Sequence, residues 1–110
     1  MATPTAYDKR LIAVFIIDAI NNSDLSNPTI TAWTTAAQFK AAIENQPFKT
    51  FSQKQDYQAY GRNIQAGIDA GILTDANVNA ASSKATLVDI AQAFITDTPD
   101  NHQGGSHWWA

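Results

Sequence analysis

The stretch YDKRLIAVFIIDAI, residues 7–20, decides how the fold is interpreted, because its run LIAVFII holds six large apolar residues. These residues are too close together in sequence to share one stripe of a helix. A buried strand is the competing interpretation, since the run is rich in β-branched residues. The charged residues before the run, the alanines near it and the capping-box spacing of Thr5 and Asp8 favour a helix. We therefore predict a central α-helix over residues 7–20, with Phe15 buried in the core.

Two further segments combine helical spacing of apolar residues with a residue that can cap a helix. The first follows Thr35 and is rich in alanine, and Pro47 ends it. The second follows Ser82 or Ser83 and continues through KATLVDIAQAFI. Between them, the segment TDANVNAASS is turn-like, with room for one short helical turn. These patterns predict two helices, one before and one after a third predicted helix.

The third predicted helix begins at the capping box formed by Ser52 and Gln55. It ends at Gly71, because glycine is suited to the left-handed position of a helix C-cap. Gly67 and Gly71 form a small-xxx-small pair, which here indicates close helix packing together with the cap. The sequence thus predicts an all-α fold, a small bundle of about four helices with an extended aromatic C-terminal tail. We assign residues 1–97 to the helical domain and residues 98–110 to the tail.

Composition excludes several function classes. Only 15% of the 110 residues are charged, against about 25% in typical proteins. The net charge is −3, which provides no dense positive field for a phosphate backbone, so we expect no direct nucleic-acid ligand. Asp18 closes the apolar run far short of the roughly 20 residues of a membrane span. We expect a soluble protein of the cytoplasm or of a virion, with no membrane association and no signal peptide.

Four basic residues gather in the middle of the chain, whereas the residues after Lys84 are acidic or neutral. A solvated face explains this asymmetry at least as well as a binding patch does. The four residues are Lys40, Lys49, Lys54 and Arg62.

No catalytic, cofactor-binding or metal-binding set stands out. His102 and His107 both lie in the glycine-containing tail, where nothing fixes the geometry that catalysis or metal ligation needs. Tyr57 and Tyr60 have helical spacing and are more typical of a core or an interface than of an aromatic binding platform. We expect a protein that is not an enzyme and has no cofactor. A pocket formed by Asp56, Tyr57, Tyr60 and Arg62 would favour an enzyme instead.

The tail ends in NHQGGSHWWA, which places two tryptophans after a Gly-Gly pair. Tryptophan brings a large apolar area with few rotatable bonds, and it is enriched among residues that anchor protein interfaces. We therefore predict that His107, Trp108, Trp109 and Ala110 bind a protein partner. The surface they bind is the protein's own body, a second copy or a different protein, and an engineered tail is the remaining alternative.

These features together predict a non-enzymatic structural or assembly subunit. Its partners are other protein subunits, and it forms a homo-oligomer because the central helix is apolar on more sides than one small core covers. In composition and layout, without a shared motif, the chain is similar to small virion proteins of tailed bacteriophages, such as head-to-tail adaptors, neck proteins and capsid-associated proteins. A monomeric binding module or inhibitor of a single partner is the alternative.

Overall fold

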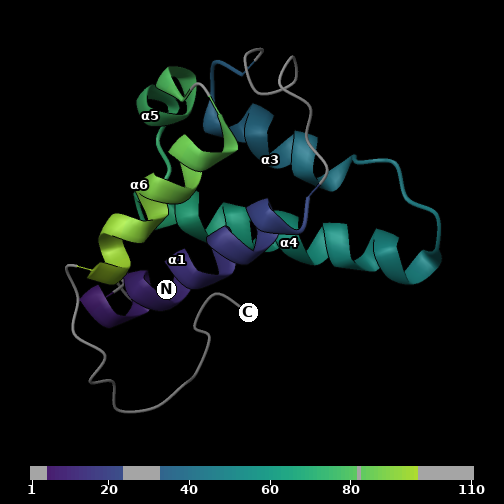
Figure 1. Ribbon diagram of the computed structural model, residues 1–110, viewed down its shortest axis with the longest axis horizontal. Coiled ribbons are helices and arrows are strands. Elements are labelled where there is room, and N and C mark those ends of the chain that lie inside the picture. The colour runs from purple at the N-terminus through teal and green to yellow at the C-terminus, as the bar shows by residue number, and fades with distance from the viewer. Residues whose placement is uncertain (1–4, 24–32, 82, 97–110) are drawn as a thin grey trace.

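Within residues 5–23, 33–81 and 83–96, which the computed structural model describes, the chain forms five helices and no strand. This confirms the predicted all-α bundle. Figure 1 shows the N-terminal helix packed against the longest helix and against the last one. None of these helices has both the length and the apolar character that crossing a membrane requires. The helices are α1 (Ala6–Asn21), α3 (Ala36–Glu44), α4 (Phe51–Asp69), α5 (Asp75–Ala80) and α6 (Lys84–Thr96).

Threonine begins four of these five helices, because its hydroxyl accepts a hydrogen bond from a backbone N–H of the first turn that has no partner within the helix. The capping box of Thr5 and Asp8 is confirmed at the start of α1. Thr35 is the N-cap of α3, as predicted, but it forms no capping box, because the Gln38 side chain accepts from the Thr34 N–H instead. Thr74 caps α5, which occupies the segment predicted to hold one short helical turn. Ser83 accepts from the N–H of Thr86 and so begins α6, whereas Ser82 lies outside the described residues.

The predicted start of the third helix is wrong by two residues. Thr50, and not Ser52, is the N-cap of α4, since the Thr50 hydroxyl accepts from the Gln53 N–H at 3.1 Å. The Gln53 side chain in turn accepts from the Lys49 N–H at 2.7 Å. These two hydrogen bonds fix the connection that precedes α4 and let the helix start at Phe51.

The central helix α1 runs antiparallel to α6. At one end, the Arg10 guanidinium donates to the carbonyl of Ile95 at 2.8 Å. At the other end, the Lys84 ammonium donates to the carbonyl of Ser23 at 2.7 Å. The two hydrogen bonds join both ends of α6 to α1. The two helices pack against each other between these bonds (Figure 1).

Close packing of α1 on α4 depends on Gly67. A β-carbon at this position would collide with the side chain of Ile16, which is fully buried. Gly71 has a φ of 78°, and the N–H groups of Ile72 and Leu73 both donate to the Gly67 carbonyl. The predicted roles of the two glycines, close packing and the helix cap, are therefore confirmed.

Most of the apolar surface of α1 is covered by its neighbours. Five residues of the helix have no exposed surface, and Val14, at 39%, is its one large apolar residue that is exposed. Phe15 is half-buried, so the prediction that it lies in the core is wrong. Leu11 and Ile17 are half-buried as well, so α1 keeps some apolar surface uncovered, and the association predicted from it stays a prediction. The five covered residues are Ile12, Ala13, Ile16, Ala19 and Ile20.

We predict that Phe39→Ala lowers the free energy of unfolding by about 3–5 kcal/mol, because Phe39 is fully buried and the change leaves a cavity. Its ring also packs against Trp33, with centroids 4.8 Å apart. Phe15→Ala should cost clearly less. Urea unfolding followed by circular dichroism measures both, and an equal loss in the two variants would contradict the burial described above.

Candidate functional site

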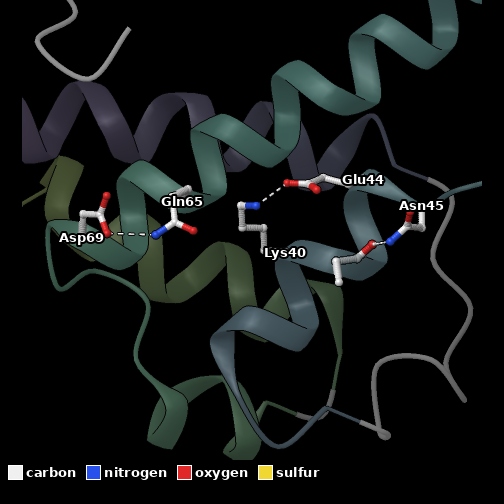
Figure 2. A network of polar contacts seen from close by, with 6 residues as sticks. Lys40, Glu44, Asn45, Gln65 and Asp69 are labelled. Atoms are coloured by element: carbon white, nitrogen blue, oxygen red, sulfur yellow. Dashed lines mark hydrogen bonds and ion pairs between the residues drawn. The ribbon is translucent and has the colours of Figure 1, made fainter.

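One end of α4 projects beyond the rest of the bundle. The side chain of Glu44, in the last turn of α3, lies directly against Gly61, so the part of α4 before Gly61 extends past the end of α3. Figure 2 shows Glu44 paired with Lys40 on α3, beside α4. In Figure 1 the start of α4 and the connection from α3 form the right-hand end of the molecule. We call residues 46–57 the elbow.

Two large aromatic side chains of the elbow face solvent. Phe48 is 50% exposed and Phe51 is 70% exposed. Among the six residues at 51–56, five are exposed and only Gln53 is half-buried. Exposed aromatic residues that gather on one small feature are typical of surfaces that bind another protein. The elbow thus carries two of the three large apolar side chains that are exposed in the part of the chain that the structure describes.

The elbow carries two lysines, and one of them lies over an aromatic ring. The Lys54 ammonium is 5.5 Å from the centroid of the Phe48 ring, which is within the range of a cation–π interaction. Phe51 lies one helical turn before Lys54, so the two side chains are neighbours on the helix surface. Lys49 is exposed in the connection itself. The elbow therefore combines aromatic rings with positive charge, and it holds two of the four basic residues in the middle of the sequence.

A hollow of about 320 Å³ opens beside Phe48. This volume is at the low end of the roughly 300–1,000 Å³ of small-molecule pockets, so it is matched to one large side chain more than to a cofactor. Tyr57, only 6% exposed, closes its inner side. The lining residues are Gln46, Pro47, Phe48, Lys49, Gln53 and Tyr57.

The base of the elbow is fixed to α1 by a buried amide. Gln46 is 5% exposed, and its Nε2 donates to the Ser23 hydroxyl at 3.0 Å and to the Ile43 carbonyl at 2.9 Å. Ser23, also buried, donates its own hydroxyl to the carbonyl of Ala19 in α1. Pro47 follows and lacks an N–H, which ends the helical conformation of α3. One side of the hollow is therefore held by hydrogen bonds, while Phe48 faces solvent.

Tyr57 and Tyr60 pack together on the face of α4 that turns toward the bundle. Their ring centroids are 6.2 Å apart, and Tyr60 is half-buried. Burial raises the pKa of the Tyr60 phenol above its usual value of 10.0, and the negative charge of Asp56 raises it further. The prediction that these tyrosines belong to a packed surface is confirmed.

The arrangement that would have favoured an enzyme does not form. Asp56 and Arg62 are exposed on α4, and of the four residues in question only Tyr57 lines the hollow. In the ranges described, no three potential metal-ligating side chains come together. The geometry of the elbow suits the burial of an apolar side chain and contact with a negatively charged group.

The predicted partner-binding residues His107, Trp108, Trp109 and Ala110 lie outside the described residues, as does the whole tail, 98–110. Sequence reasoning missed the elbow. A signal was present in PFKTF, residues 47–51, which places two aromatic residues around a lysine just after a helix-ending proline. Helical spacing does not explain aromatic residues at such a position.

Comparisons with known proteins add no identification. The chain matches no protein-family model, no curated protein and no solved structure. The functional proposal therefore depends on the contacts of the chain itself.

We predict that the stability of the protein decreases above about pH 10 in part through Tyr60. The raised pKa means that the folded state holds the phenol proton more tightly than the unfolded state does. This contribution is complete below pH 10 and is lost as the pH rises through the pKa of the folded state. The free energy of unfolding, measured in urea at pH 9 and pH 11, should fall further in the wild type than in Tyr60→Phe. Equal losses would contradict the assignment.

Proposed function

We propose that the protein is a non-enzymatic assembly subunit that binds other protein subunits, copies of itself included, through the elbow. The observation that carries the proposal is the exposure of Phe48 and Phe51, at 50% and 70%, on an end of α4 that projects from the bundle. A projecting helix end with two exposed aromatic rings gains stability when a partner covers it, because apolar area leaves water.

Within this class, we propose a virion component of a tailed bacteriophage, as a head-to-tail adaptor or neck protein or as a capsid-associated protein. Two features support it. The charged fraction of 15% leaves a surface of small polar residues that repels neighbouring subunits weakly. A small helical body followed by an extended terminal segment, as the sequence predicts for residues 98–110, also has the layout of such proteins.

A monomeric module that binds one partner is the second candidate. The observation that favours it is the hollow of about 320 Å³, which is matched to a single anchoring side chain. The two candidates differ in self-association, since a module of this kind stays monomeric and binds one to one.

The test replaces both exposed rings, Phe48→Ser with Phe51→Ser. Sedimentation velocity over a range of concentrations should show that the wild type self-associates. The association constant of the double variant should be at least tenfold lower. The helical circular dichroism spectrum and the Tm should change little, because neither ring belongs to the buried core.

Val14→Ser is the matched control, since Val14 is a large exposed apolar residue of α1 outside the elbow. This variant should associate like the wild type. A wild type that stays monomeric at every concentration would contradict the assembly proposal and favour the single-partner module. Equal loss in the Val14 variant would show that the elbow is not the surface that binds.

A further inference from the structure

The elbow is basic and aromatic, and one segment of the chain complements it in both respects. Residues 46–55 carry Lys49 and Lys54 and no acidic residue, and both lysines are exposed. Residues 97–110 carry Asp97 and Asp100 and no lysine or arginine. Opposite charges on two surfaces favour their encounter and fix their relative orientation.

The acidic residue nearest to the elbow lysines does not cancel this charge. Asp56 follows Lys54 by two residues, which places it about 200° around the helix axis, on the other side of α4. Glu44 is already paired with Lys40 on α3. The side of the elbow that carries Phe48, Phe51 and Lys54 therefore keeps its positive charge.

The hollow also matches the aromatic residues of that segment. Its volume of about 320 Å³ suits one large side chain, and Phe48 and Lys49 form part of its lining. Residues 97–110 include Trp108 and Trp109, each able to bury about 150–250 Å². Tryptophan is also the best aromatic partner for a cation such as Lys54.

We propose that residues 97–110 of one copy dock on the elbow of a second copy, with a tryptophan in the hollow and the aspartates facing Lys49 and Lys54. This rests on the proposed function, which it deepens by naming the occupant of the elbow. Because each copy carries both surfaces, the contact closes into a dimer that exchanges tails or into a larger ring, or it continues as a filament.

The positions of the two surfaces favour a second copy over the same chain. Thr96 ends α6 beside Arg10, whereas the elbow lies beyond the opposite end of α1 (Figure 1). Measured along the helix axes from the contact of Ile16 with Gly67, Arg10 and Phe51 lie about 33 Å apart. A random-coil segment of the twelve residues from Thr96 to Trp108 would span only about 17–21 Å. Docking on the same chain therefore requires a strongly extended segment, whereas docking on a neighbouring molecule does not.

The test uses two full-length variants and their mixture. The elbow variant carries Phe48→Ser and Phe51→Ser, and the tail variant carries Trp108→Ala and Trp109→Ala. Each variant alone should be monomeric in native mass spectrometry, at concentrations where the wild type associates. An equimolar mixture should form a heterodimer and nothing larger, because one intact tail and one intact elbow remain.

A tail variant that associates like the wild type would overturn the proposal while leaving the elbow as a binding surface for another occupant. Two monomeric variants whose mixture forms no heterodimer would overturn it as well, because the tail then docks elsewhere. A wild type that is itself monomeric would overturn both this proposal and the assembly function. His102→Ala is the matched control in the same segment, and its association should equal that of the wild type.

The charges are tested separately. Lys54→Asp should lower the association constant at least tenfold. A variant that combines Lys54→Asp with Asp100→Lys should recover most of this loss. Recovery by the pair is expected only if the two side chains face each other across the contact. Equal weakening in the single and paired variants would overturn the proposed orientation.

Discussion

The close approach of α1 and α4 at Gly67 is the constraint on which the rest of the structure depends. Ile16 occupies the space that a β-carbon at Gly67 would need, and this lets two helix backbones come together around a narrow core. Because α1 is then covered by α4 on one side and by α6 on the other, a chain of modest length buries five residues of this helix completely. The same contact sets the position of α4 along α1. It therefore determines how much of α4 remains outside the bundle.

The projecting end of α4 follows from the contact of α4 with α1 together with a second contact, between α4 and α3. Glu44 lies against Gly61, so α3 ends well before the start of α4 is reached, and the connection must run outward. Gln46 and Ser23 hold the base of this connection to α1 through a buried hydrogen bond. The outer part is held by its own hydrogen bonds, which join Gln53 to Lys49 and to Thr50, and the rings of Phe48 and Phe51 are left exposed. An anchored base and an uncovered tip are what a docking surface requires, because binding then orders few additional residues.

Sequence reasoning succeeded where a signal is local and failed where exposure depends on how helices align. The caps at Thr5 and Thr35 and the turn at Gly71 are set by neighbouring residues, and all three are confirmed. The start of α4 was misplaced because Thr50 and Ser52 offer similar caps, and the side chain of Gln53 favours the first. The half-burial of Phe15 and the elbow itself arise from tertiary alignment, which periodicity along one helix does not contain. The predicted binding residues at 107–110 lie outside the described part of the chain, so their role stays a prediction.

Hydrogen exchange at the elbow, measured as a function of protein concentration, tests the central claim most directly. The claim is that the start of α4 is covered only when another molecule docks on it. The backbone amides of residues 54–57 should then exchange more slowly as the concentration rises through the association range, while the amides around Ile16 in the buried helix keep a constant rate. Exchange at residues 54–57 that does not depend on concentration, in a sample that does associate, would contradict the account.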